Sequence, residues 1–239
     1  MNRLTINWTR FLLGIAGDVV KDIDKLTSEQ RRSVFIIDDT FYPALYAKQT
    51  ELVSRIYDHA EKGKNKLKKG FRMLTLGWSD GVSFVPVAFR HLASADKEKR
   101  YCESKPNLDK RSRAFLIRKE AVTKATEILL KQLKAAAAAG VTAKHVLFDS
   151  WFAYPLTITR IQELGLHVTA RVKDTAKIHY LVNSEKKTAQ QIFRENKKRP
   201  GKSRYLLSVP ITLFATDETR EVQLPAKLVY VRNRNKRND

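Results

Sequence analysis

Apolar residues recur every three or four positions over several stretches of the chain. Over residues 8–25 this spacing predicts an amphipathic helix. Residues 47–60 also have helical character. A longer helix is predicted over residues 112–139, where an alanine run extends it and Gly140 ends it. Residues 155–164 form a further predicted helix that ends at Gly165.

Other apolar runs are short and predict strands. Residues 33–38, 144–149 and 166–172 each form one such run. Residues 71–77 and 82–89 flank an Asp-Gly pair, which predicts a β-hairpin. Residues 91–110 show no periodicity and are expected to form a surface loop. Beyond residue 173 the chain is strand-like with turns, at residues 178–182, 204–213 and 222–231.

The order of these elements predicts an α/β fold. From residue 33 it reads strand, two-stranded hairpin, long helix, strand, helix and strand, which implies a mixed sheet with helices in its crossovers. We expect a helical lead-in over residues 1–30, a core over residues 31–172, and a β-rich part over residues 173–239.

Two of the predicted strands end on aspartate. Asp38 and Asp39 close the first, and Asp149 closes the strand after the long helix. An Asp at a strand end can simply form a turn or cap a helix. Two acid-tipped strands in one sheet also suit a site that holds Mg²⁺ or Mn²⁺ for phosphoryl transfer. Successive strand residues point to opposite faces, so only one of Asp38 and Asp39 can face such a site, and the sequence leaves the choice open.

The charge of the chain favours a polyanionic partner. Lys and Arg number 46 against 25 Asp and Glu, a formal net charge of +21, while 43% of residues are hydrophobic. Nucleic acid is the first expectation, ahead of an anionic membrane surface or a merely basic protein. The phosphate contacts are expected from two basic segments, namely Lys64, Lys66, Lys68 and Lys69, and Lys197, Lys198, Arg199 and Lys202. Residues 232–237 form a third basic segment.

Several other kinds of site are excluded. Cys102 is the single cysteine, which rules out an internal disulfide and a Cys-rich zinc site and favours a cytosolic protein. Residues 62–70 are predicted to form a basic loop, which lacks the Gly-Lys-Ser/Thr ending of a P-loop. The five histidines show no metal-ligand spacing, and His145 is expected to pack in the core. No apolar stretch approaches the roughly 20 residues that span a bilayer.

Three sequence blocks carry a family resemblance: residues 35–40 (FIIDDT), 69–81 (KGFRMLTLGWSDG) and 147–152 (LFDSWF). With them the chain resembles bacterial insertion-sequence transposases of the DDE type, whose catalytic domain has an RNase H-like fold. The resemblance implies Mg²⁺-dependent hydrolysis at transposon ends and transfer to target DNA, in the bacterial cytoplasm at the nucleoid, with a homodimer in full-length members. It places Asp38 or Asp39 beside Asp149 on neighbouring strands, with Thr40 and Ser150 hydrogen-bonding nearby.

The third acid of that family is a Glu in a Tyr-Arg-Glu-Lys type signature after a β-rich insertion. Residues 173–239 resemble the insertion, and no such signature follows. Five glutamates lie too early or in strand and turn contexts to serve: Glu163, Glu185, Glu195, Glu218 and Glu221. We therefore expect a truncated copy that binds DNA without cleaving it. The alternatives are a non-catalytic nucleic-acid-binding module, in which the aspartates cap turns, and a cellular nuclease of the same fold.

Overall fold

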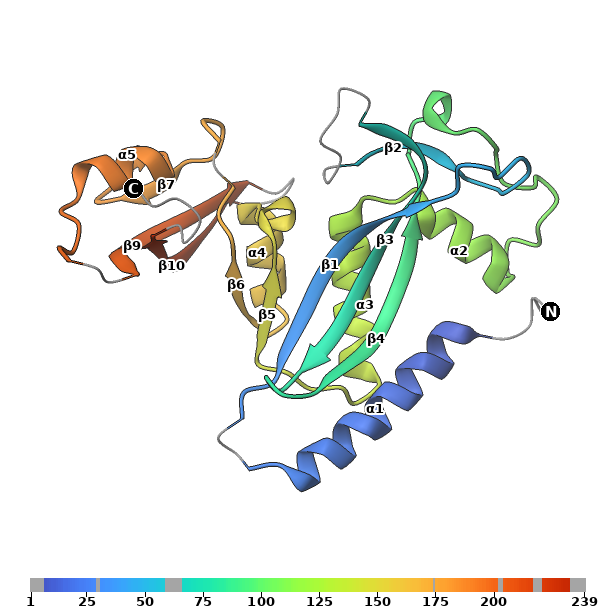
Figure 1. Cartoon of the computed structure of the whole chain (residues 1–239), viewed down its shortest axis with the longest axis horizontal. Helices are drawn as coiled ribbons and strands as arrows, with labels where there is room; N and C mark the ends of the chain where they lie inside the picture. Colours follow the sequence, from blue (N-terminus) through green and yellow to red (C-terminus); the bar gives the residue numbers. More distant parts are fainter. Residues whose placement is uncertain are drawn as a thin grey trace. The chain divides into compact units, whose positions relative to one another are not determined.

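The computed structural model describes residues 7–28, 31–58, 66–173, 175–201, 204–216 and 221–232. The chain divides into two compact units. The first comprises Met1–Phe148 and Leu164–Thr169, and the second comprises Asp149–Glu163 and Ala170–Asp239. Figure 1 shows the elements of each unit along the chain.

A six-stranded sheet forms the centre of the first unit (Figure 1). Its strands follow the order β2-β3-β1-β5-β6, and β4 also pairs with β3. Because β1 is antiparallel to β3 and parallel to β5, the sheet is mixed, and the predicted RNase H-like α/β class is confirmed. The strands are β1 (Val34–Pro43), β2 (Ser54–Tyr57), β3 (Leu67–Ser79), β4 (Phe84–Leu92), β5 (His145–Phe148) and β6 (His167–Ala170).

Helix α1 (Trp8–Leu26) confirms the first predicted helix, but its buried stripe is different from the expected one. Leu13, Ala16, Gly17 and Val20 are buried, whereas most of the large apolar residues that defined the pattern remain exposed. A Cβ atom at Gly17 would come within 2.6 Å of the Ala139 carbonyl oxygen. The close approach of α1 to the end of α3 therefore selects the small residues of α1 as its contact face.

The long predicted helix is two helices, α2 (Arg113–Ala121) and α3 (Ala125–Ala138). The carbonyl oxygen of Ala121 accepts a hydrogen bond from the Ala93 amide at 2.7 Å, just after β4. That carbonyl is thus bonded outside the helix, and α2 ends there. The predicted end of α3 is confirmed: Gly140 has φ +80°, and the Val141 amide donates to the Ala136 carbonyl at 3.0 Å.

The helix expected over residues 47–60 was wrong throughout its described part, residues 47–58. Turns lead into β2, and Leu52 has φ 63°, which an α-helix does not accommodate. Leu52, Val53 and Ile56 are buried because β2 pairs with residues Leu67–Gly70 of β3. The same pairing makes residues 67–70 a strand, where the sequence predicted a basic loop.

The predicted hairpin is confirmed, with its turn two residues later than expected. Trp78 belongs to β3 and is fully buried. The turn is held by Asp80, whose Oδ1 accepts from the amides of Val82 (3.0 Å) and Ser83 (2.6 Å). Its Oδ2 accepts from Arg31 Nη1 at 2.7 Å. These hydrogen bonds, the Ser83 amide first, lower the pKa of Asp80 to about 2.

We expect Asp80 to make stability depend on acid pH. Its folded-state pKa lies below the unfolded value, about 3.9, so its contribution is complete above that value and is lost as the pH falls toward 2. Asp80→Ala should lower the free energy of unfolding at pH 7 by about 1–3 kcal/mol, because two amides lose their acceptor. Urea unfolding between pH 2 and 7 measures both effects. An equal acid slope in the variant and the wild type would contradict this role.

The second unit is rich in strands, as predicted, and its antiparallel sheet has the order β10-β9-β7-β8. Its core includes Tyr180, Ile192, Val209, Ile211 and Leu228. Helix α5 was missed, although Thr188 and Gln191 form a capping box that the sequence displays. The elements are α4 (Pro155–Gln162), β7 (Tyr180–Val182), β8 (Glu185–Lys187), α5 (Ala189–Glu195), β9 (Tyr205–Thr216) and β10 (Glu221–Val231).

None of the helices in the described ranges is long and apolar enough to cross a bilayer.

Candidate active site

The sequence predicted that the first strand ends at its aspartates, but β1 continues through Asp38 and Asp39 to Pro43, because its pairing with β3 continues to that residue. Within the strand the two aspartates point to opposite faces of the sheet. Phe35 and Ile37 are buried, and Asp39 continues on their face by the two-residue alternation of a strand. Asp38 lies on the other face and is exposed. One carboxylate is therefore turned toward the covered side of the sheet, and the other toward solvent.

Asp39 is engaged by an ion pair. Its Oδ2 accepts from Arg72 Nε at 2.7 Å and from Arg72 Nη2, and the two side chains are only 14% and 26% exposed. Arg72 stands on β3, two residues from Leu74, which is the register partner of Asp39. Asp38, by contrast, makes a local hydrogen bond: its Oδ1 accepts from the Asp39 amide at 2.8 Å. The structure thus separates two residues between which the sequence could not choose.

Asp149 comes directly after β5. In the parallel register of β1 and β5, Ile37 pairs with Phe148, and Asp38 and Asp149 are the next residue on each side. Asp149 is exposed and extended, with φ −77° and ψ 170°. Its Oδ1 accepts the Ser150 amide at 2.6 Å and caps a 3₁₀ turn, Ser150–Phe152. The capping role that the sequence allowed is therefore present, and Oδ1 alone performs it.

Within the second unit, aromatic side chains and a lysine gather just after Asp149. Lys173 Nζ donates to the Tyr154 hydroxyl at 2.7 Å. It lies 5.3 Å from the ring centre of Trp151 and 4.7 Å from that of Tyr154. Both aromatic rings remain about two-fifths exposed, at 41% and 42%. Trp151 stood out in the sequence beside Asp149, whereas Lys173 lies 22 residues further on and carried no local signal there.

The face of the sheet that carries Asp38 also carries an aromatic cluster. The ring of His91 stacks on Tyr42 (centroids 5.5 Å apart) and on Phe71 (5.3 Å), with Phe89 beside it. Burial lowers the pKa of His91, which keeps this imidazole neutral near pH 7. Tyr42 and Phe89 are half exposed, so the cluster offers flat apolar rings to solvent on the same face as Asp38.

The predicted basic segments differ in the exposure of their Lys and Arg side chains and in the contacts that these side chains make within the protein. Lys69 Nζ donates to the Ala47 carbonyl and lies 4.9 Å from the ring centre of Tyr101, so it is tied to its own unit. Lys66 lies over the Tyr57 ring at 5.7 Å, and Lys68 is half-buried on β3. In the second unit Lys197 and Arg199 are exposed, and Lys198 lies over the Phe193 ring at 4.5 Å. Lys64 and Lys202 are outside the described residues.

In the described parts of the chain no three His, Cys, Asp or Glu side chains are grouped to hold an ion. His145 is half-buried, and its ring lies 5.4 Å from that of His167 in a tilted arrangement. Cys102 Sγ donates to the Lys48 carbonyl at 3.3 Å. The carboxylates of Asp38 and Asp149 supply oxygen donors, which suit Mg²⁺ or Mn²⁺.

Comparison with known proteins gives one finding on family. A family model described as "DDE superfamily endonuclease" matches residues 15–238, which is nearly the whole chain. No curated protein sequence matches it.

Proposed function

The chain belongs to the DDE superfamily of endonucleases, and from this premise we propose that it is a transposase in which Asp38 and Asp149 bind the catalytic metal ion. At the level of the family it is a nuclease-type protein that acts on DNA, and such endonucleases generally use divalent metal ions. We also propose that the chain derives from a bacterial insertion sequence.

The register of β1 and β5 is the observation that carries the proposal. Ile37 and Phe148 are partners in a parallel pair, and an exposed aspartate follows each of them. Register partners on parallel strands point to the same face, and Asp149 keeps the extended backbone that continues this alternation. Asp39 is unsuited to the role because Arg72 holds it on the covered face.

The metal would be held by Asp38 and Asp149, and Thr40 and Ser150 would orient these carboxylates by hydrogen bonds. Both acids use Oδ1 for a local backbone amide, and no described residue donates to Oδ2 of either. A bound Mg²⁺ would activate the attacking oxygen and stabilise the leaving oxygen of the phosphodiester. The chain itself would contribute the exposed carboxylate oxygens of Asp38 and Asp149.

DNA would be bound through charge and through stacking. In the second unit the exposed cations Lys197 and Arg199, with Lys198, would contact DNA phosphates. In the first unit Lys66 and Lys68 would do so. Lys64, Lys69 and Lys202 complete the expected set. Tyr42 and Phe89, on the same sheet face as Asp38, would support the unpaired bases of a cleaved end.

Titration with Mn²⁺, followed by the relaxation of solvent protons, tests the metal site. The wild type should bind Mn²⁺, and Asp149→Asn should weaken binding at least about tenfold, because one of two anionic ligands is lost. Asp22→Asn on α1, where the side chain is 71% exposed, is the matched control and should bind as the wild type does. Equal binding by all three proteins would favour the non-catalytic module, in which Asp149 only caps a turn.

Cleavage assays separate the transposase from a general nuclease. A transposase should cut duplexes that end in the element's inverted repeats and join the 3′ ends to target DNA. Cleavage of any duplex at the same rate, without joining, would favour the cellular nuclease. DNA binding by the wild type without cleavage of any duplex would instead support the expected inactive copy.

A further inference from the structure

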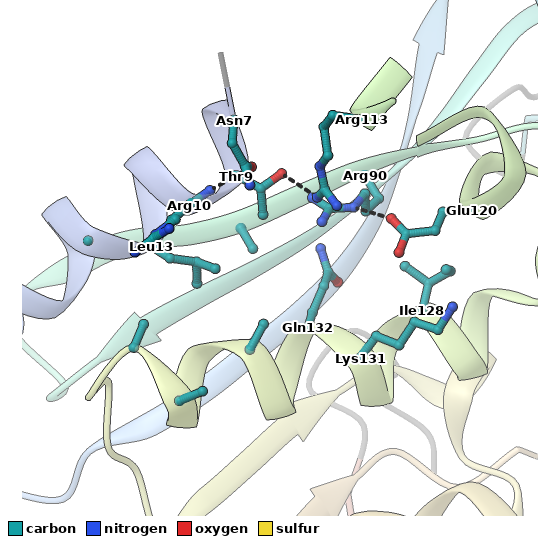
Figure 2. A pocket seen from close by; sticks show the side chains of 15 residues that line it. Asn7, Thr9, Arg10, Leu13, Arg90, Arg113, Glu120, Ile128, Lys131 and Gln132 are labelled. Atoms are coloured by element: carbon teal, nitrogen blue, oxygen red, sulfur yellow. Dashed lines mark hydrogen bonds and ion pairs between the residues drawn. The ribbon is translucent and has the colours of Figure 1, made fainter. Parts of the chain in front are cut away.

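A cavity of about 630 Å³ lies in the first unit between α1, β4, α2 and α3 (Figure 2). It is separate from the proposed metal site. Arg90 lines the cavity from β4, and its register partner on β3 is Leu74, whose partner on β1 is Asp39. These three side chains share one face of the sheet, so the cavity and the exposed Asp38 lie on opposite faces.

The walls of the cavity combine an apolar surface with an excess of positive charge. Leu13, Ala88, Ile128 and Ala135 are among its apolar lining residues. The charged lining residues are four cations and one carboxylate: Arg10, Arg90, Arg113, Lys131 and Glu120. Glu120 Oε2 accepts from Arg90 Nε at 3.1 Å, which leaves the other three cations without a carboxylate on the cavity wall. The net field therefore favours an anion.

Two buried polar atoms on this wall have no hydrogen-bond partner among the described residues: Gln132 Oε1 and Arg113 Nε. Gln132 is only 3% exposed, and its Nε2 reaches the Leu74 carbonyl at 3.5 Å. Arg113 Nη2 donates to Thr9 Oγ1 at 3.3 Å. Figure 2 shows the Gln132 side chain extending from α3 toward Arg113 and Arg90. Buried polar atoms without partners are rare in folded proteins, and here an acceptor and a cationic donor line one space.

We propose that this cavity binds a small phosphorylated organic molecule of mononucleotide size. Its phosphate accepts from Arg113 Nε, with Lys131 and Arg10 adding charge at the exposed mouth. An N–H or O–H group of the organic part donates to Gln132 Oε1, and the apolar wall covers the rest. The volume lies within the range of about 300–1,000 Å³ that small-molecule sites occupy.

Isothermal titration of the full chain with the four ribonucleoside 5′-monophosphates tests the proposal. At least one should bind, and its nucleoside without phosphate should bind at least about tenfold more weakly, because the charge-assisted hydrogen bonds are lost. Arg113→Gln should weaken nucleotide binding by a similar factor. Arg111→Gln is the matched control, since Arg111 stands two residues earlier with its side chain 94% exposed and outside the cavity.

Gln132→Leu separates a binding role from a structural one. It removes the acceptor at similar volume, so nucleotide binding should weaken about five- to tenfold while the thermal midpoint stays equal or rises. Arg113→Gln should leave Mn²⁺ binding unchanged, so failure here is distinguishable from failure of the metal site. The proposal is overturned if no monophosphate binds at millimolar concentration, if both variants bind as the wild type does, or if Arg113→Gln impairs only the binding of duplex DNA.

Discussion

Replacing Asp38 by Asn is expected to weaken Mn²⁺ binding at least about tenfold, to lower any Mg²⁺-dependent DNA cleavage at least about 100-fold, and to leave the fold intact. The carboxylate is exposed and makes one local hydrogen bond, to the Asp39 amide, which the Asn side-chain oxygen can also accept. What is lost is the anionic oxygen that the metal requires. Mn²⁺ titration, single-turnover cleavage of labelled duplex DNA and unfolding by urea measure the three effects, and the Mn²⁺ titration does not require a wild type that cleaves.

Asp39→Asn is the matched control on the same strand. It removes the charge that holds Arg72, so it should lower the free energy of unfolding by about 1–3 kcal/mol. Mn²⁺ binding, and any cleavage, should persist at a temperature where the variant is folded, because Asp39 faces the covered side of the sheet. The reverse pattern, with cleavage lost in Asp39→Asn and retained in Asp38→Asn, would overturn our choice between the two residues.

Trp78→Ala should produce the largest loss of stability, about 3–5 kcal/mol in the free energy of unfolding. The indole is fully buried in the first unit, and its Nε1 donates to the Thr142 carbonyl at 2.9 Å. Truncation would leave a cavity, and the Thr142 carbonyl would lose its donor. Unfolding by guanidinium chloride, followed by far-UV circular dichroism, measures the change.

Trp8→Ala on α1 is the control for this substitution. Its side chain is 56% exposed, so the same change of residue should cost less than about 1 kcal/mol. A loss at Trp78 as small as that at Trp8 would mean that β3 and the segment around Thr142 do not form one cooperative core.

Local patterns in the sequence predicted most elements of the sheet and several boundaries. The Asp-Gly pair located the hairpin, and Gly140 located the end of α3, because both positions need a positive φ that glycine adopts without strain. Two errors came from contacts distant in sequence. Ala93 bonds the Ala121 carbonyl and ends α2, and pairing with β3 makes residues 54–57 a strand rather than part of a helix.

At the candidate site, too, local sequence patterns did not reveal contacts between residues distant in sequence. Both acidic positions were visible in the sequence because each follows an apolar run, although only β5 ends there and β1 continues to Pro43. Strand alternation also required that only one of Asp38 and Asp39 face the site. The choice between them needed Arg72, which stands 33 residues away on β3 and binds Asp39. Lys173, which reaches the Tyr154 hydroxyl, had no local signal either.

By itself the sequence determined a basic α/β protein with aspartates that follow the apolar runs of two strands, since composition and short-range periodicity are properties of the chain. Tertiary structure decided which aspartate is exposed, which apolar residues of α1 are buried, and that Gln132 and Arg113 line one cavity. Each of these depends on a partner far along the chain. The physical reason is that burial and charge pairing are set by the packing of elements, and no local pattern contains that packing.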